Sequence, residues 1–311
     1  MPCYHPVTCW YSTDGGPLSF KAPVPGDESF YRGTKDCMRC RGCLRKYAGE
    51  WSIRCLHEAK MHARNCFVTL TYDWDHLPPG QSLRKHDFIS FIKRLRNAHR
   101  DLQIRFFGCG EYGSRTFRPH YHICLFGVDF PDLIPLGKSQ SGQAMFDSEL
   151  LRKLWGFGLV TVQPVTEATA GYVAGYVLKK LESGAARRDG AREWWKTLPG
   201  RESEFIHMSR NPGIGQLWFE RYHRDLFKRD AESKELRDQV VVLSENGARE
   251  VVVPGYYMRL LRKWCEDDYQ EIKDRRMVES VKTAADRTRR RLEVREQVDA
   301  ANGRRQKREA F

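Results

Sequence analysis

The sequence predicts an α+β protein built on a central antiparallel sheet of the split βαβ, ferredoxin-like type, with helices on one face. Three observations support this class. Strand-like and helix-like runs follow one another in the order β-α-β-β-α-β-α over residues 66–181. Two of the strand-like runs are joined by a short turn typical of a hairpin. The chain of 311 residues is also long enough to bury a sizeable core.

The first half of this core contains a strand, a helix and a hairpin. Residues 66–72 alternate in polarity and are rich in β-branched side chains, which indicates a strand. Residues 86–99 repeat apolar side chains at helical spacing. Residues 104–110 and 118–127 are aromatic and aliphatic runs, and the Gly- and Ser-containing stretch 113–116 predicts the turn between them.

The second half of the core begins after a predicted loop at 130–143. Residues 146–154 form a short predicted helix, capped by Asp147 or Ser148. Residues 158–162 predict the fourth strand. The next helix, predicted at 167–181, carries valine and leucine every four residues.

The rest of the chain carries weaker patterns. Residues 1–35 are rich in Pro, Gly and Ser and predict irregular structure, and 43–63 predict a helix. Beyond the core we expect a helix at 216–227, a hairpin at 240–253 and a charged helical tail from 256 onward. This pattern predicts four segments: a Cys-rich segment (1–60), the core domain (61–184), an accessory region (185–255) and the tail (256–311).

The charge balance points to a polyanionic partner, most simply a nucleic acid. Fifty-three Lys and Arg residues against 40 Asp and Glu residues give a formal net charge of +13. No apolar run reaches the about 18 residues of a membrane span, so we expect no membrane association. The N-terminus lacks a signal-peptide core, and we expect the protein to stay in a cytoplasm. No Walker-type phosphate-binding loop occurs, so an unwinding motor would come from another protein.

Two histidines on one predicted strand form the core of a candidate metal site. His120 and His122 share a face because side chains alternate along a strand. The predicted hairpin brings Glu111 beside them. Two imidazoles and one carboxylate can hold a divalent cation and leave positions open for a substrate. The alternative is two half-exposed histidines and a solvated glutamate in an ordinary sheet.

The predicted helix at 167–181 carries a second candidate set. Tyr172, Tyr176 and Lys179 fall on one helix face, away from the valines. Gly171 and Gly175 each cost about 1 kcal/mol in a helix relative to alanine, and their missing side chains would let a bulky partner approach the phenols. The alternative is a pair of half-buried packing tyrosines.

A third candidate set lies near the N-terminus. The ten cysteines of the chain are expected to be thiols or metal ligands rather than disulfides. Cys37, Cys40 and Cys43 have the C-x-x-C-x-x-C spacing of a structural Zn²⁺ site. The fourth ligand would be Cys3, Cys9 or His5. The alternative is a group of reduced thiols without metal.

These motifs, in this order, resemble the HUH endonucleases that start rolling-circle DNA replication. The resemblance is strongest to the replication initiators of gokushovirus-like microviruses, which are small single-stranded DNA phages. The stretches that carry it are Phe67–Asp73, Gly110–Gly113, Thr116–His122, Tyr172–Lys180 and Ser209–Gly215.

The resemblance implies a nicking and joining enzyme with Mg²⁺ or Mn²⁺ at Glu111, His120 and His122. A tyrosine would attack single-stranded DNA, form a 5′-phosphotyrosine and release a 3′-OH that primes synthesis. Tyr172 and Tyr176 would alternate, with Tyr176 favoured if one dominates. A phenol has an ordinary pKa of about 10, so the cation and Lys179 or Lys180 would favour the phenolate.

The implied partners are single-stranded and replicative-form viral DNA, together with the helicase and polymerase of the host, in a bacterial cytoplasm. Two other functions stay open at this point. A non-haem iron oxygenase also uses two histidines and one carboxylate. A nucleic-acid-binding protein without catalysis would need only the basic helices and the cysteine motif.

Overall fold

A computed structural model describes residues 3–14, 16–113, 116–139, 142–175, 200–244 and 247–309. The chain forms two compact units. One consists of Met1–Tyr47 with Lys273–Phe311, and the other of Ala48–Ile272. The division into four segments made from composition stays a prediction. The larger unit contains the hairpin that carries Glu111, His120 and His122, named the histidine hairpin.

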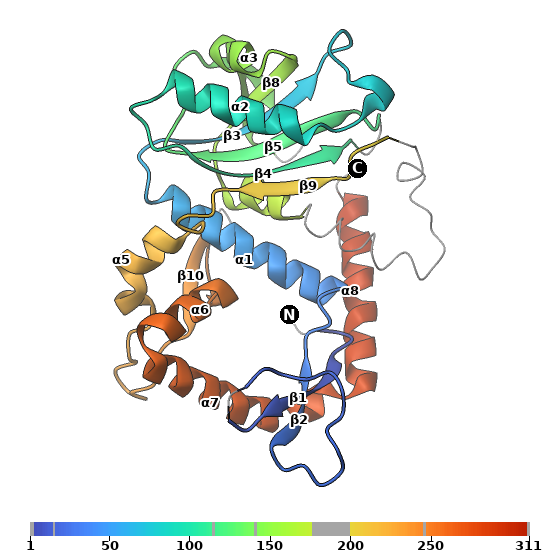
Figure 1. Cartoon of the computed structure of the whole chain (residues 1–311), viewed down its shortest axis with the longest axis vertical. Coiled ribbons are helices and arrows are strands. Elements are labelled where there is room, and N and C mark those ends of the chain that lie inside the picture. The colour runs from blue at the N-terminus through green and yellow to red at the C-terminus, as the bar shows by residue number, and fades with distance from the viewer. Residues whose placement is uncertain are drawn as a thin grey trace. The chain divides into compact units, whose positions relative to one another are not determined.

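The larger unit is built on a seven-stranded sheet with the order β6-β7-β8-β3-β5-β4-β9, in which every neighbouring pair is antiparallel (Figure 1). Four consecutive strands of this sheet are β8 (Gly158–Gln163), β3 (Asn65–Tyr72), β5 (Pro119–Phe126) and β4 (Arg105–Tyr112). Numbered along the chain, these four strands are the fourth, first, third and second of a β-α-β-β-α-β unit. A sheet with the spatial order 4-1-3-2 is the ferredoxin-like arrangement. The predicted fold class is therefore confirmed.

Helices α2 (Lys85–Ala98) and α3 (Glu149–Trp155) cover one face of this sheet (Figure 1). Ser148 is the N-cap of α3, since its side chain accepts a hydrogen bond from the backbone N–H of Leu151. The main core lies between these helices and the sheet, and contains Tyr121, Ile123 and Leu125 from β5. Alternation along β5 therefore directs His120 and His122 to the other face.

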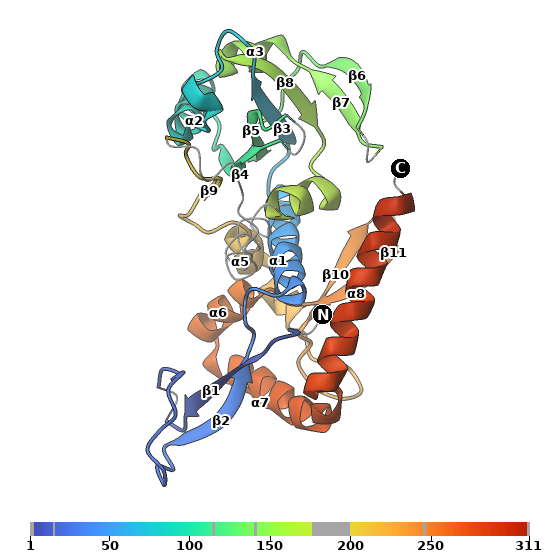
Figure 2. The same cartoon turned by 90° about the vertical axis from the view of Figure 1, so that its right-hand side faces the viewer.

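Three strands at the sheet edges escaped prediction. Strands β6 (Ile134–Lys138) and β7 (Ala144–Asp147) form a hairpin that extends the sheet beyond β8 (Figure 2). The prediction of a loop at 130–143 is wrong over β6, whose exposed Ile-Pro-Leu-Gly-Lys sequence has no alternation and is held by pairing alone. Strand β9 (Phe205–Met208) pairs with β4 at the opposite edge.

Helices also contact the histidine face. The ring of Trp51, from α1 (Arg41–Ala59), stacks on Phe107 of β4 with centroids 4.7 Å apart. The helical segment 167–175 lies beside α1, where the Ser52 hydroxyl donates to the carbonyl oxygen of Glu167 at 3.2 Å. Helix α1 therefore packs on the face of the sheet that carries His120 and His122. The helical segment 167–175, which carries Tyr172 and is named the tyrosine helix, lies beside α1.

A second core completes the larger unit. It is formed by α5 (Gln216–Leu226), β10 (Gln239–Ser244), β11 (Gly247–Val252) and α6 (Gly255–Trp264), with contributions from Ile53 and Ile272. The predicted helix at 216–227 and hairpin at 240–253 are confirmed, although residues 245 and 246 of the turn lie outside the described residues.

The smaller unit contains a hairpin that the sequence did not predict. Strands β1 (Val7–Ser12) and β2 (Phe30–Lys35) pair antiparallel, so the expectation of irregular structure over 1–35 is wrong there. The Pro- and Gly-rich stretch between them obscured two short strands of weak alternation.

Helices account for most of the remaining charged sequence. α7 (Glu266–Lys282) and α8 (Arg289–Glu309) follow α6, and short 3₁₀ turns occupy Pro79–Gln81 and Ala284–Arg287. No helix among the described residues combines the length and the apolar character needed to cross a membrane.

Candidate active site

The β4–β5 hairpin assembles the predicted metal ligands through its register. Glu111 pairs with His120, and Cys109 pairs with His122. Paired residues of antiparallel strands have their side chains on the same face. Residues two apart on one strand also share a face. Register and alternation therefore bring Glu111, His120 and His122 together.

Both imidazoles contact the same carboxylate oxygen of Glu111. The Nε2 atoms of His120 and His122 lie 2.8 Å and 3.0 Å from Glu111 Oε1. Glu111 is only 2 % exposed and His122 only 6 %. The site therefore combines a nearly dry carboxylate with two imidazoles at hydrogen-bonding distance.

The environment keeps Glu111 ionised. Burial acts to raise the pKa of this carboxyl, but hydrogen bonds from His120 and His122 and their charges outweigh it, so the pKa lies below its usual range. Glu111 is therefore a carboxylate at neutral pH, which is the form that binds a cation.

Thr69 orients one of the imidazoles, and it was absent from the predicted site. Its hydroxyl lies 3.0 Å from Nδ1 of His122, opposite the Nε2 atom that faces Glu111. Such outer partners fix the ring orientation of metal-binding histidines. The signal was present in the sequence, because alternation along 66–72 places Phe67, Thr69 and Thr71 on one face.

The three predicted ligands fit a divalent cation. One atom from each of Glu111, His120 and His122 can be chosen so that all lie within 4.8 Å of one another. Two imidazole nitrogens and a carboxylate leave several coordination positions for water or substrate. That a metal binds here, and which one, stays a prediction.

Tyr172 reaches this cluster from the helical segment 167–175. Its hydroxyl donates to Glu111 Oε1 at 3.4 Å, and its ring stands edge-on to that of His122 with centroids 4.9 Å apart. Tyr172 is 46 % exposed, so its phenol borders solvent rather than an apolar core. The other predicted residues of this helix, Tyr176, Lys179 and Lys180, lie outside the described residues.

A groove of about 570 Å³ runs along the sheet beside Tyr172 and His122. Its floor comes from β3 and β8, through Thr69, Thr161 and Gln163. Lys138 and Ser139, at the end of the unpredicted strand β6, line it as well. The groove offers polar groups and the cation of Lys138 directly next to the candidate metal ligands.

The cysteine motif also forms a cluster, in the smaller unit. Cys3, Cys37, Cys40 and Cys43 have sulfur atoms that all lie within 4.8 Å of one another. Of the candidates for the fourth position, Cys3 is the member of this cluster. His5 instead pairs with Glu296, with 2.8 Å between its Nε2 atom and the carboxylate.

Comparisons with known proteins agree with these motifs. Residues 65–181, which span strand β3, the histidine hairpin and the tyrosine helix, match the family "Replication-associated protein ORF2/G2P". The chain is 30% identical to replication-associated protein ORF2 of Spiroplasma virus 4 over 294 residues, covering 89% of this chain and 86% of that protein.

Two further phage proteins are similar. Replication-associated protein VP4 of Bdellovibrio phage phiMH2K is 30% identical over 281 residues, covering 86% of this chain and 81% of that protein. Replication-associated protein ORF4 of Chlamydia phage 1 is 32% identical over 240 residues, covering 75% and 54%. No solved structure matches the chain. The chain therefore belongs to the replication-associated protein family of microvirus-like phages, as the motifs of its hairpin and tyrosine helix predicted.

Proposed function

We propose that this protein starts rolling-circle replication as a metal-dependent HUH endonuclease that nicks and rejoins single-stranded DNA through a 5′-phosphotyrosine. One observation carries the proposal. The hydroxyl of Tyr172 and the Nε2 atoms of His120 and His122 all contact the same oxygen of Glu111. A phenol nucleophile and a cation site are thereby next to each other.

The ligand set would hold Mg²⁺ or Mn²⁺ through Glu111, His120 and His122. When bound, the cation offsets negative charge on the scissile phosphate and on the transition state. Thr69 keeps the ring of His122 in position. Burial of Glu111 and His122 excludes water from the far side of the site, so the open side toward Tyr172 is left for the DNA.

The tyrosine carries the transfer. The phenolic oxygen forms a bond to phosphorus while the bond from phosphorus to the 3′-oxygen breaks. The phenolic proton passes to water, and the released 3′-oxygen takes a proton from water to become the 3′-OH. Rejoining reverses these steps, so atoms and charge balance over the cycle. Tyr176, with Lys179 or Lys180 favouring the phenolate, would perform the alternate transfer.

An exposed indole and a half-buried guanidinium beside the hairpin support a single-stranded substrate. Trp74 is 78% exposed, and the Arg118 guanidinium lies 4.1 Å from the centre of its ring. Arg118 directly precedes β5, two residues before His120. Exposed indoles and guanidinium groups stack on unpaired bases. The proposed substrates are therefore single-stranded and replicative-form viral DNA, with a helicase and a polymerase of the bacterial host as partners.

A nicking assay tests the proposal directly. Overlapping single-stranded oligonucleotides that tile the genome encoding this chain would be incubated with the full chain and Mn²⁺ or Mg²⁺. We expect a cleaved product with a free 3′-OH and a protein–DNA adduct that survives denaturing electrophoresis. The Tyr172→Phe/Tyr176→Phe double variant should form no adduct, because it retains both rings but has neither nucleophilic oxygen.

Two controls separate this function from its rivals. EDTA should abolish cleavage and Mn²⁺ should restore it, without iron or oxygen, which an oxygenase would need. An adduct that persists in the double tyrosine variant would refute the mechanism. DNA binding without cleavage on every oligonucleotide and with either metal would leave a binding protein.

A further inference from the structure

The thiols of Cys3, Cys37, Cys40 and Cys43 form a cluster in the smaller unit. The Sγ atoms of Cys3 and Cys40 lie 3.8 Å apart, and those of Cys37 and Cys43 lie 3.9 Å apart. A disulfide requires about 2.05 Å. A tetrahedral Zn²⁺ site with bonds of about 2.3 Å has sulfur–sulfur edges of about 3.8 Å. These two distances match edges of such a tetrahedron, and all four sulfur atoms lie within 4.8 Å of one another.

Backbone N–H groups point at these sulfur atoms. The N–H of Tyr4 donates to Cys40 Sγ at 3.2 Å, and that of Cys37 donates to Cys3 Sγ at 3.2 Å. The N–H of Cys40 donates to Cys37 Sγ at 3.3 Å. Donors of this kind stabilise thiolates and orient the ligands of metal sites. They are independent of the sulfur spacing.

The cysteine cluster is also part of the buried interior of the smaller unit. Cys3, Cys40 and Cys43 are buried, and with Tyr4 they form an apolar cluster of their own in the smaller unit. Small units with little apolar core commonly depend on a metal or on disulfides. We propose that Cys3, Cys37, Cys40 and Cys43 bind one structural Zn²⁺ that ties the N-terminal segment to the start of α1.

Metal analysis of the full chain tests this site. Protein purified under reducing conditions should contain one Zn²⁺ per chain by mass spectrometry of the metal. Co²⁺ taken up in place of Zn²⁺ should show the strong thiolate charge-transfer absorption, which the imidazole and carboxylate cluster at Glu111 cannot produce. Cys40→Ser and Cys3→Ser should each lose both the bound Zn²⁺ and this absorption.

Two other cysteines serve as matched controls. Cys9 lies on β1 and Cys265 follows α6, and neither belongs to the cluster. Cys9→Ser and Cys265→Ser should keep one Zn²⁺, and Cys265→Ser is the control if loss of the buried Cys9 thiol prevents folding. Wild-type protein without thiolate-bound Zn²⁺ or Co²⁺ would overturn the proposal, as would two native disulfides in this cluster under non-reducing conditions.

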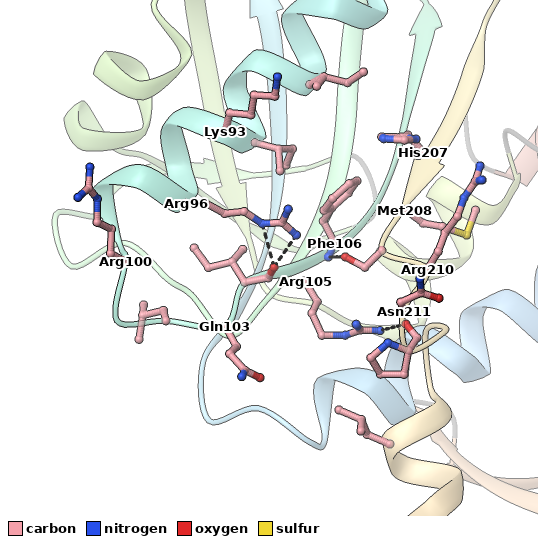
Figure 3. A pocket seen from close by; sticks show the side chains of 17 residues that line it. Lys93, Arg96, Arg100, Gln103, Arg105, Phe106, His207, Met208, Arg210 and Asn211 are labelled. Carbon is pink, nitrogen blue, oxygen red and sulfur yellow. Dashed lines mark hydrogen bonds between the residues drawn. The ribbon is translucent and has the colours of Figure 1, made fainter.

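A basic groove lies at the β9 edge of the sheet. This groove of about 910 Å³ lies between α2 and the stretch that follows β9. Figure 3 shows Lys93, Arg96 and Arg100 on one side and Arg210 on the other. None of the described residues that line it is acidic, whereas five are Lys or Arg. The nicking residues Glu111, His120, His122 and Tyr172 do not line it.

Two of the five cations are held by the protein itself. Arg96 donates from Nε and Nη2 to the carbonyl oxygen of Ile104 at 3.3 Å and 2.9 Å. Arg105 donates to the carbonyl oxygen of Pro212 at 2.7 Å and pairs with Glu58. Among the described residues no ion pair involves Lys93, Arg100 or Arg210. These three side chains are exposed and remain for a ligand.

The positions of these cations fit an extended polyanion. Lys93 lies on α2, Arg100 lies two residues beyond the last residue of that helix, and Arg210 follows β9, so the three cations come from separate points along the groove. Burial and the nearby cations Lys85 and Arg210 lower the pKa of His207 in the same groove, in accord with a positive local field. We propose that the groove binds the DNA backbone on one side of the nick, an inference that rests on the proposed nicking function.

Salt-dependent binding tests this groove. The Lys93→Ala/Arg100→Ala/Arg210→Ala variant would be titrated with fluorescent 40-nucleotide single strands and with the matching duplex. The binding constant K falls with salt, so the slope of log K against log salt is negative. For the single strand we expect this slope to become less steep by about 2, since each of the three phosphate contacts contributes about 0.7. Cleavage of a minimal oligonucleotide by this variant should remain within twofold of wild type.

A second triple variant controls for net charge. Arg64→Ala/Lys153→Ala/Arg229→Ala removes three cations that pair with Asp129, Glu149 and Glu271 elsewhere in the larger unit. It should change the slope by less than half as much. Equal slopes for the two triple variants would overturn the groove proposal. Because binding is measured without cleavage, failure of the groove and failure of the nicking function are separate outcomes.

Discussion

Two buried carboxylates lie on one face of strand β4, near its two ends. Glu58 comes from α1 and meets Arg105 of β4, whereas Glu111 belongs to β4 itself. At one end Arg105 pairs with Glu58, which is 0% exposed. Glu58 also accepts from the backbone N–H of Gly215 at 2.6 Å and lies 3.3 Å from His62 Nε2. At the other end Glu111 has two histidines and a phenol for neighbours.

The difference shows how one residue type serves structure at one site and chemistry at another. A guanidinium is always charged and compensates Glu58 permanently. An imidazole can be neutral and offers a lone pair, so the Glu111 site has its ligand atoms ready for an added cation. Burial alone therefore does not distinguish the two sites. The kind of partner does: a guanidinium meets Glu58, whereas two imidazoles and a phenol meet Glu111.

The largest expected effect comes from Glu111. Glu111→Gln keeps the size of the side chain but removes the anionic ligand. Changes one shell further out cost metal sites about 10–100-fold, and losing a charged ligand should cost more, so we expect Mn²⁺-dependent adduct formation to fall by at least about 1000-fold. The free energy of unfolding, from urea titration in EDTA, should change little. Adduct formation within tenfold of wild type would contradict the assignment.

Glu58→Gln should reverse this pattern. It leaves Arg105 buried without its counter-charge, which typically destabilises a protein by about 3–5 kcal/mol. We expect that loss in urea unfolding at neutral pH, together with near-normal adduct formation per folded molecule. If the variant is as stable as wild type but inactive, Glu58 belongs to the chemistry and the comparison fails.

The Glu58 end of β4 should also make stability depend on pH. Burial raises the pKa of Glu58, but hydrogen bonds from His62, Gly215 and Arg105 outweigh it, and the pKa is lowered overall. A lowered pKa contributes stability above the unfolded value of about 4.3 that is lost as pH falls through the folded pKa. The stability gap between wild type and Glu58→Gln should therefore shrink below about pH 4. Parallel stability curves down to pH 3 would show that Glu58 is not the titrating group.

Thr69→Val sharpens the account of the Glu111 end. Valine has the shape of threonine but cannot hold Nδ1 of His122. We expect Mn²⁺ affinity, measured by calorimetry, to fall by about 10–100-fold, as for other outer-shell changes. Thr161→Val is the matched control, since Thr161 pairs with Thr69 across the sheet and lines the same groove without contacting the ligands. Equal losses in both variants would argue for a general effect on the groove.

The smallest expected effect is at Gly175, on the tyrosine helix. Within the described part of the chain, a Cβ atom placed there meets no atom within 4 Å outside its own stretch of helix. Gly175→Ala should therefore stabilise the protein by up to about 1 kcal/mol in urea unfolding. If DNA approaches Tyr172 over this glycine, adduct formation should fall a few-fold despite the higher stability. Unchanged adduct formation would show that the space above Gly175 is not used.

Much of the central fold could be predicted, because its signals are local. Alternation in 66–72 and 118–127 and helical period in 86–99 each depend on neighbouring residues, and these elements lie within a few residues of their predicted bounds. Strands β1, β2, β6 and β9 could not be found this way. They are short, interrupted by Gly or Pro or weakly alternating, and they exist because a partner strand is available.

The sequence by itself determined the chemistry of the candidate site. Alternation put His120 and His122 on one face, and a hairpin turn was enough to bring Glu111 to them. Tertiary structure alone decided that Tyr172 reaches the same oxygen, that Thr69 holds His122 and that Cys3 joins the other three thiols. The physical reason is range: spacing along one element fixes which side chains share a face, whereas contacts between elements depend on how the whole unit packs.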